Sequence, residues 1–237
     1  MFNLWWGVWF VFVNFVCFVL CFRLFGKKGL YAWIGIATVI ANIQVTKTIE
    51  IYGIALTLGN TMYVSVYMAS DLLNEKYGRA EARKGVWFGF FSLIVTTVLM
   101  QMALKFQPAP DGQSVQQSME SIFGLLPQLA AGSLTAYFVS QLLDVSLYAW
   151  IRNFFPKPNQ LWIRNNGSTM ISSFVDTLIF CTIAFWNYDF PIWFEILLTT
   201  YAIKFILTAA GTPVMYIARS FHKEEDAENK GEAAAEG

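Results

Sequence analysis

The sequence is dominated by charge-poor apolar runs of about 20 residues, a length that crosses a bilayer as a helix. Inside the bilayer every backbone N–H and C=O needs an internal partner, and a helix supplies one. Hydrophobic residues make up 56% of the 237 residues and charged residues only 14%. A soluble domain usually has about a quarter charged residues, so this chain is too apolar for a single water-soluble core. We therefore expect an all-α, polytopic membrane helical bundle.

Seven runs are predicted to be transmembrane helices. They are Leu4–Phe22, Leu30–Val45, Ile54–Leu72, Val86–Leu104, Leu129–Tyr148, Thr169–Trp186 and Ile192–Ile217. The first run has no basic segment before it, so it does not resemble a cleaved signal peptide. We expect it to be retained as a helix, with the N-terminus outside.

Lys and Arg residues gather in alternate connections between these runs, and cytoplasmic loops are the ones enriched in such residues. Thirteen fall on one side: Arg23, Lys27, Lys28, Lys76, Arg79, Arg83, Lys84, Arg152, Lys157, Arg164, Arg219, Lys223 and Lys230. The other side has only Lys47 and Lys105. The alternation predicts seven spans with the N-terminus outside and the C-terminus in the cytoplasm.

Two segments outside the spans differ in character. The connection 107–127 is expected to face outside, as a plain connector, a surface helix or a lid. The acidic, alanine-rich tail 223–237 lacks apolar periodicity and is expected to be disordered. The formal net charge of zero gives no indication of nucleic acid as a partner.

Several spans contain polar residues at helical spacing. An ionised side chain near the bilayer centre costs ~3 kcal/mol on insertion scales, so such residues usually face a partner or a cavity. The third and fifth spans each have a polar stripe, and three other spans contribute further residues. These residues are Asn60, Tyr63, Tyr67, Asp71, Asn74, Ser133, Tyr137, Gln141, Asp144, Tyr148, Thr38, Asn42, Thr46, Ser172, Ser173, Asp176, Tyr201, Lys204 and Thr208.

Some of these residues have simpler interpretations. Asp71 and Glu75 could lie at the cytoplasmic interface, solvated beside basic residues. Asn42 could join two helices by a hydrogen bond, and Tyr63 and Tyr148 could belong to an aromatic belt.

Asp144, Asp176 and Lys204 are harder to place at an interface. They could form a structural ion network, or they could line a polar cavity between helices. The second interpretation predicts a small-molecule transporter.

Five stretches carry a family resemblance, in this order: VIANIQVTK, SDLLNEKYGRAEARK, SQLLDVSLYAWIR, SSFVDTLIFCTIAFW and TYAIKFILT. Together they resemble the queuosine precursor transporters, also called the vitamin uptake transporter family. The resemblance covers about Leu30–Arg219. It implies a multi-pass protein of the bacterial cytoplasmic (inner) membrane, with six core helices and both ends of the core cytoplasmic.

On this basis we expect three parts: an extra N-terminal transmembrane helix with its basic loop (1–29), a six-helix transporter core (30–222) and the acidic tail (223–237). The resemblance implies 7-deazaguanine substrates, namely the 7-cyano and 7-aminomethyl precursors of queuosine, or queuine. It implies no enzymatic activity, cofactor or metal. Membrane lipid is an expected partner, and a homo-oligomer is left open.

The residue types suit such a substrate, because a carboxylate can accept the adjacent ring N–H and amino group of a guanine-like ring. Amide or ammonium groups can donate to its carbonyl oxygen, and tyrosines can stack on the ring. The candidate substrate-binding residues are Asn42, Tyr63, Tyr67, Asp71, Tyr137, Gln141, Asp144, Asp176 and Lys204. Asp144, Asp176 and Lys204 are expected at the centre of the site, with Asn42 and Asp71 at its edges.

Other functions stay open at this stage. The chain could carry another small heterocycle or vitamin, or serve as the substrate-binding subunit of an ATPase-coupled importer. Asp144 and Asp176 lie on successive spans, as in an intramembrane aspartyl protease, but their LLDV and FVDT contexts do not match such enzymes. The energy source is not indicated.

Overall fold

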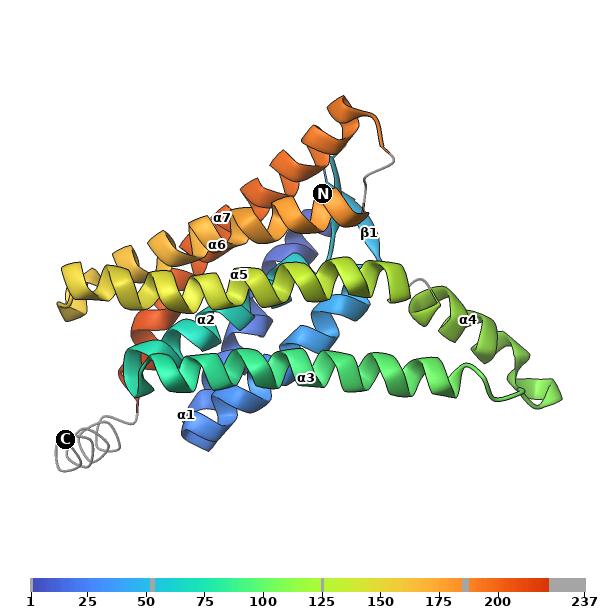
Figure 1. Cartoon of the computed structure of the whole chain (residues 1–237), viewed down its shortest axis with the longest axis horizontal. Coiled ribbons are helices and arrows are strands. Elements are labelled where there is room, and N and C mark those ends of the chain that lie inside the picture. The colour runs from blue at the N-terminus through green and yellow to red at the C-terminus, as the bar shows by residue number, and fades with distance from the viewer. Residues whose placement is uncertain (1, 52–53, 125, 185–187, 222–237) are drawn as a thin grey trace.

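The computed structural model describes residues 2–51, 54–124, 126–184 and 188–221, which form a bundle of long helices with one short β-hairpin (Figure 1). The helices are α1 (Phe2–Gln44), α2 (Asn60–Tyr77), α3 (Arg79–Ala103), α4 (Gln113–Phe123), α5 (Leu126–Phe154), α6 (Leu161–Ala184) and α7 (Phe190–Arg219). Strands β1 (Thr48–Ile51) and β2 (Ile54–Thr57) pair antiparallel. Short 3₁₀ turns η1 (Pro110–Gly112) and η2 (Pro158–Gln160) precede α4 and α6. The helical bundle agrees with the predicted fold class, and the hairpin was not predicted.

Helix α1 consists of two arms that double back on each other at Gly26. This residue has φ 55° and ψ −138°, a left-handed conformation that glycine adopts without a Cβ clash. Asn3, at the start of the first arm, donates from Nδ2 to the Glu50 carbonyl beyond the end of the second arm, at 3.0 Å. Midway along the arms, the rings of Phe18 and Trp33 lie 5.9 Å apart. The two arms therefore correspond to the first two predicted spans.

The third predicted span, Ile54–Leu72, is wrong at its start. Residues Ile54–Thr57 form β2, and α2 begins only at Asn60. Both strands of the hairpin are short runs that include Ile and Thr, β-branched residues that favour an extended backbone. Apolar content alone does not separate a short strand from the first turn of a helix.

Helix α2 lies at the centre of the bundle, where it packs against α1, α3, α5, α6 and α7. Every residue from Asn60 to Lys76 is buried. Because protein surrounds this helix on all sides, it can carry Asp, Asn, Glu and Lys that a lipid-facing helix would not tolerate.

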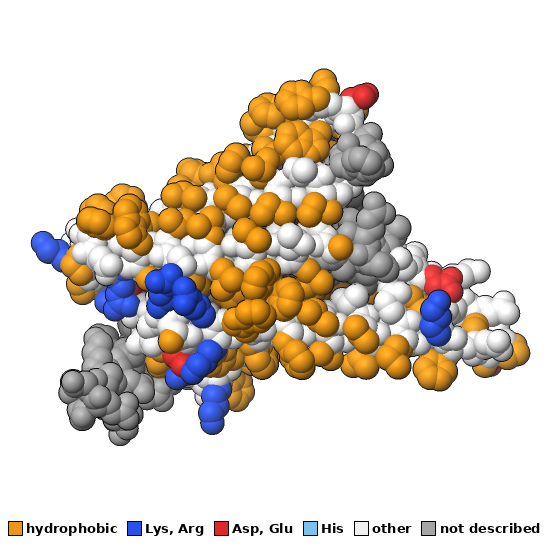
Figure 2. Space-filling model, in the orientation of Figure 1, with side chains coloured by type: hydrophobic (Ala, Val, Ile, Leu, Met, Phe, Trp, Pro, Cys, Tyr) orange, Lys and Arg blue, Asp and Glu red, His pale blue; other side chains and the backbone are white. Residues whose placement is uncertain are grey.

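The surrounding helices have the opposite character. In the described part of the chain, five helical segments are long and apolar enough to span a membrane: Phe2–Gln44, Arg79–Ala103, Ala131–Phe154, Pro158–Ala184 and Phe190–Arg219. They expose large apolar side chains such as Trp5, Phe91 and Ile206. Figure 2 shows apolar side chains along much of one face of the bundle. This outward arrangement is expected of a bundle whose solvent is lipid.

The basic connections meet at one end of the bundle, here called the basic end. Lys27, after the kink of α1, forms an ion pair with Glu81 at the start of α3, at 2.6 Å. Arg152, near the end of α5, donates to the Asn74 carbonyl near the end of α2. Most Lys and Arg side chains in the view of Figure 2 gather at this end. The described basic connections that were predicted to share one side of the membrane therefore share one end of the structure, whereas the tail 223–237, predicted to be disordered, lies outside the described residues.

The opposite end, here called the hairpin end, holds β1 and β2. The connection there between α3 and α5 forms an exposed surface helix, α4, in agreement with one of the three interpretations of this segment. Gln101 and Gln116 tie α4 to α3, by hydrogen bonds to the Phe123 and Leu104 carbonyls.

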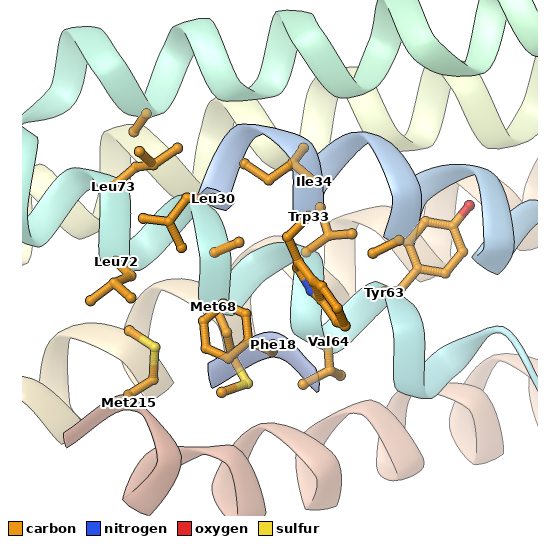
Figure 3. Close-up of a cluster of buried hydrophobic side chains, with 14 of the residues drawn as sticks. Phe18, Leu30, Trp33, Ile34, Tyr63, Val64, Met68, Leu72, Leu73 and Met215 are labelled. Atoms are coloured by element: carbon orange, nitrogen blue, oxygen red, sulfur yellow. The ribbon is translucent and has the colours of Figure 1, made fainter. Parts of the chain in front are cut away.

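An apolar cluster fixes α2 against α1 and α7 (Figure 3). Phe18 and Trp33 of α1 meet Met68 of α2, and Met215 of α7 closes the other side. Gly211 of α7 has no side chain to separate it from the Met68 sulfur, which lies 2.7 Å from the position a Cβ would take. This close packing orients α2, so that its polar stripe faces α5 and α6.

Candidate functional site

The polar residues of the spans are buried inside the bundle. All nine candidate binding residues have at most 8% of their surface exposed. Asp71 and Tyr148 are fully buried, and Glu75 is 7% exposed. This burial does not fit a solvated interface for Asp71 and Glu75, or an aromatic belt for Tyr148.

Asp176 of α6 and Lys204 of α7 form the first group of side chains, here called the paired centre. Lys204 Nζ lies 2.6 Å from Asp176 Oδ2 and 3.2 Å from Thr177 Oγ1. Ser140 of α5 donates to Asp176 Oδ1 at 2.9 Å and accepts from the Tyr67 hydroxyl at 3.0 Å. Both Asp176 oxygens therefore have a donor, and the ion pair joins α7 to α6 and, through Ser140, to α5 and α2.

The paired centre continues toward the hairpin end through Tyr63. Lys204 Nζ lies 5.6 Å from the centre of the Tyr63 ring, within the range of a cation–π contact. The Tyr63 hydroxyl lies 2.7 Å from Ser133 Oγ and accepts from Asn42 Nδ2 at 3.1 Å. Ser133 also donates to Asn42 Oδ1 at 2.7 Å. Asn42 therefore does bridge helices, and it does so inside the predicted site.

Asp71 of α2 and Asp144 of α5 form a second pair, and this pair consists of two carboxyl groups in contact. Both side chains are fully buried. Ser172 donates to Asp144 Oδ1 at 2.7 Å, and Thr169 lies 3.4 Å from Asp71 Oδ2. The two carboxyl groups also hydrogen-bond to each other. Asp71 Oδ1 and Asp144 Oδ2 accept from no other donor among the described residues. Two carboxylates in contact repel each other unless a proton or another donor lies between them.

Two buried amides lie one helical turn from residues around this pair: Gln141 before Asp144 on α5, and Asn165 before Thr169 on α6. Gln141 accepts from Ser70 at 3.3 Å, but its Nε2 has no acceptor. Asn165 of α6 is fully buried, and neither its Nδ2 nor its Oδ1 has a partner. Asp71, Gln141, Asp144 and Asn165 are here called the unpaired centre. Asn165 was missed in the sequence because RNNGS resembles a loop, although Asn165, Thr169, Ser172 and Asp176 share one helical face.

A third group lies at the basic end around Glu75 of α2. Its carboxylate contacts Arg164 at 2.6 Å and Arg219 at 2.9 Å, and accepts from the Tyr148 hydroxyl at 3.0 Å. Arg152 lies 3.8 Å away. Glu75 and these three arginines are here called the ion cluster. It joins the ends of α2, α5, α6 and α7 and was not predicted.

Arg164 was predicted to lie in a basic connection between spans, and this prediction is wrong. Arg164 lies in α6 and is fully buried. Its guanidinium also donates to the Phe155 and Lys157 carbonyls, at 2.6 and 2.9 Å. Its charge is therefore held by the protein and not by solvent.

Tyr137 is the one candidate whose hydroxyl points toward α3. The Tyr137 hydroxyl oxygen lies 3.5 Å from the Val86 carbonyl oxygen and occupies the space that a side chain at Gly89 would take. The other candidates belong to the paired or unpaired centre, or to the network of Tyr63. Among the described residues, no group of three or more His, Cys, Asp or Glu side chains is arranged to hold a metal ion.

An apolar outer surface and a polar interior shared by α2, α5, α6 and α7 define a multi-pass membrane protein with an intramembrane polar site. Comparisons with known proteins give the family. Residues 57–218 match the family described as "Putative vitamin uptake transporter". The chain belongs to this family of transporters, and it is a multi-pass protein of the bacterial inner membrane.

Individual relatives agree with this assignment. The chain is 47% identical to a "Probable queuosine precursor transporter" of Bacillus subtilis over 220 residues, which cover 92% of this chain and 96% of the relative. It is 23% identical to the "Queuosine precursor transporter" of Escherichia coli over 180 residues, covering 74% and 78% of the two chains. A "Probable queuosine precursor transporter" of Haemophilus influenzae is 27% identical over 134 residues, covering 55% and 52%. No solved structure matches the chain.

Proposed function

We propose that this protein imports queuosine precursors of the 7-deazaguanine class, namely the 7-cyano and 7-aminomethyl bases or queuine, across the cytoplasmic membrane. The observation that carries the proposal is the 47% identity, over nearly the full length of both chains, to a protein named as a queuosine precursor transporter. The buried polar interior supports it independently, because a structural bundle has no need of so many costly groups.

The chemistry of the interior suits a guanine-like ring. Asp71, Asp144 and Asp176 are acceptors for the adjacent ring N–H and amino group. Asn42, Gln141 and Lys204 are donors for the carbonyl oxygen. The rings of Tyr63, Tyr67 and Tyr137 are flat apolar faces close to these groups. Together these nine residues are the proposed binding site.

The proposed topology has seven passes, with the N-terminus outside and the C-terminus in the cytoplasm. The two arms of α1 are the first two passes, and α2, α3, α5, α6 and α7 are the others. The first arm precedes a six-helix core that begins near Leu30. The basic end then faces the cytoplasm, as the enrichment of Lys and Arg in cytoplasmic loops predicts.

Transport requires the buried site to open alternately to each side. In the present conformation the side chains of the site contact one another, and the ion cluster of Glu75 ties four helix ends together on the proposed cytoplasmic side. We propose that this conformation is closed toward the cytoplasm and that the ion cluster separates when substrate is released there.

Uptake in cells that lack their own importer tests the proposal. Labelled forms of the three bases would be supplied in turn, and the entry of each followed together with queuosine in tRNA. Expected results are uptake by the wild type, loss of uptake in Asp144→Asn and Asp176→Asn at equal membrane levels, and normal uptake in the exposed control Asp111→Asn. A well-expressed wild type that takes up none of the three bases contradicts the proposed function.

A further inference from the structure

A groove follows the outer surface of the bundle between the second arm of α1 and α3, and it is here called the α1–α3 groove. It consists of two adjoining hollows of about 410 and 520 Å³, and Ala32 and Phe88 line both of them. On the inner side, Ile34 of α1 is fully buried against Gly85 and Gly89 of α3. This packing separates the groove from the polar interior, so the groove is not part of the proposed substrate site.

The hollow farther from the basic end is apolar. Its lining side chains on α1 include Ile36, Val39 and Ile40. Ser92 of α3 is the polar side chain in this lining, and its hydroxyl already donates to the Phe88 carbonyl at 2.8 Å. An apolar hollow on a bundle whose solvent is lipid suits a hydrocarbon chain.

The hollow nearer to the basic end has lysines on both of its walls, Lys28 from α1 and Lys84 from α3. Lys28 is exposed and forms no ion pair with a described residue. Glu81 also lines this hollow, and its carboxylate lies 2.6 Å from Lys27 and 2.5 Å from Lys84. The Lys84 side chain is 70% exposed, and its ammonium has further N–H groups to donate. Three lysines surround one carboxylate, which leaves an excess of positive charge.

The length of the groove matches one leaflet of a bilayer. From Lys28 to Ile40, α1 advances roughly 18 Å at about 1.5 Å per residue. Half of the hydrocarbon core of a bilayer measures about 15 Å. On α3 the lining residues Lys84, Phe88 and Ser92 recur every four positions, so the groove runs along both helices. It therefore extends from the charged basic end toward the middle of the bundle.

We propose that the α1–α3 groove is a binding site for one anionic phospholipid, whose phosphate lies between Lys28 and Lys84 and whose acyl chain fills the apolar hollow. Charge complementarity selects this occupant, because an anionic headgroup compensates the excess positive charge, whereas a zwitterionic headgroup brings a positive charge of its own. Basic pockets between transmembrane helices on the cytoplasmic side bind anionic headgroups in this way. On the proposed topology the basic end faces the cytoplasm, so the lipid belongs to the inner leaflet. The inference does not depend on which substrate is carried.

Native mass spectrometry of the purified protein tests the proposal. The protein would be supplied with equal amounts of phosphatidylglycerol and phosphatidylcholine that have the same acyl chains. The wild type should retain one phosphatidylglycerol with a preference of about thirtyfold, or about fivefold for each ammonium group. The double variant Lys28→Gln with Lys84→Gln should show a preference of about twofold or less.

A matched control removes two charges at the same end without touching the groove. Arg83 and Lys157 are exposed residues near the starts of α3 and α6, and neither lines either hollow. The double variant Arg83→Gln with Lys157→Gln should keep the lipid preference within about twofold of the wild type. An equal loss in this control overturns the inference, because the lipid would then be attracted to the whole basic end.

A second variant tests the apolar part of the groove with every charge in place. Ala32 is exposed where the two hollows meet, so Ala32→Phe fills the groove without entering the core. Retention of phosphatidylglycerol should fall about tenfold, as for the loss of about two buried CH₂ groups. Unchanged retention in Ala32→Phe, or a wild type without lipid preference, overturns the inference. A dimer that Ala32→Phe dissociates also overturns it, since a second copy of the chain would then occupy the groove.

Discussion

Asp176 in the paired centre and Asp144 in the unpaired centre are both buried aspartates in the middle of long helices, yet their surroundings are opposite. Asp176 faces an ammonium group and a hydroxyl that satisfy both its oxygens. Asp144 faces another carboxyl group and shares a hydrogen bond with it, which requires a proton on one of the two. Within the proposed site, Asp176 therefore also joins α6 to α5 and α7, and a ligand reaches it only by displacing one of these partners.

The ion cluster at the basic end contains a third buried carboxylate, that of Glu75, and this one is paired with arginines. Glu75 is one helical turn beyond Asp71 on α2, and it is surrounded by Arg152, Arg164 and Arg219. The polar stripe of α2 thus runs from a fully paired carboxylate to an incompletely paired one within four residues. We infer that the first holds the helices and that the second is available to the substrate.

The largest loss of stability is expected for Glu75→Ala. Arg164 would be left with a buried charge and no carboxylate, which costs ~3–5 kcal/mol. The free energy of unfolding, measured by denaturant titration in mixed micelles, should fall by this amount. Glu81→Ala is the control, since Glu81 pairs with the exposed Lys84 and the partly exposed Lys27 at the same end and should cost ~1 kcal/mol or less. Equal losses for the two variants would show that the ion cluster does not hold the helices.

The second largest loss in the free energy of unfolding, about 3 kcal/mol, is expected for Asp176→Asn, because the substitution leaves the Lys204 ammonium buried without its counter-charge. The double variant Asp176→Asn with Lys204→Met removes both charges and should lose less than Asp176→Asn alone. The same titration in a double-mutant cycle measures this coupling. Strictly additive losses would mean that the pair contributes nothing as a pair.

A smaller effect is expected for Asn42→Ala, which removes the bridge between Tyr63 and Ser133. The hydroxyls can still bond each other at 2.7 Å, so the expected loss is about 1–2 kcal/mol. Thermal unfolding in detergent measures it. The matched variant Asn3→Ala removes an exposed hydrogen bond at the hairpin end and should change stability less. A loss as large as that of Glu75→Ala would place Asn42 among the main structural groups.

The smallest effect on stability, and a large effect on transport, is expected for Asp71→Asn. The substitution removes the acidic group of one of two carboxyls in contact and leaves an amide that can donate to Asp144, so the folded state without substrate should be as stable as the wild type or more stable. Uptake should nevertheless fall about a hundredfold, the scale of a lost hydrogen bond to a charged group. A marked loss of stability would place Asp71 with the paired residues and remove the contrast between the two centres.

Much of the fold was predictable because it depends on local patterns. The lengths of the apolar runs predicted helices α3, α5, α6 and α7 and the two arms of α1. Polar residues spaced three and four apart identified the stripes of α2 and α5. Strand β2 at Ile54–Thr57 was not predictable, because a four-residue strand and a helical turn can have the same composition.

The pairing of the polar residues was not predictable either. Glu75 and Arg164 are 89 residues apart, and nothing local to either one indicates the other. Arg164 and Asn165 lie in a segment that resembles a loop, and only the packing of α6 shows that both are buried. The sequence reveals which residues are costly to bury, whereas their partners depend on how the helices pack.

Binding of 7-aminomethyl-7-deazaguanine to the purified protein tests the central claim most directly. The melting temperature would be measured across a range of ligand concentrations for the wild type and for Asp144→Asn. The wild type should be stabilised progressively as ligand increases, while Asp144→Asn should match it without ligand and gain no stability with ligand. A wild type that the ligand does not stabilise, or an Asp144→Asn variant stabilised equally, would contradict this account.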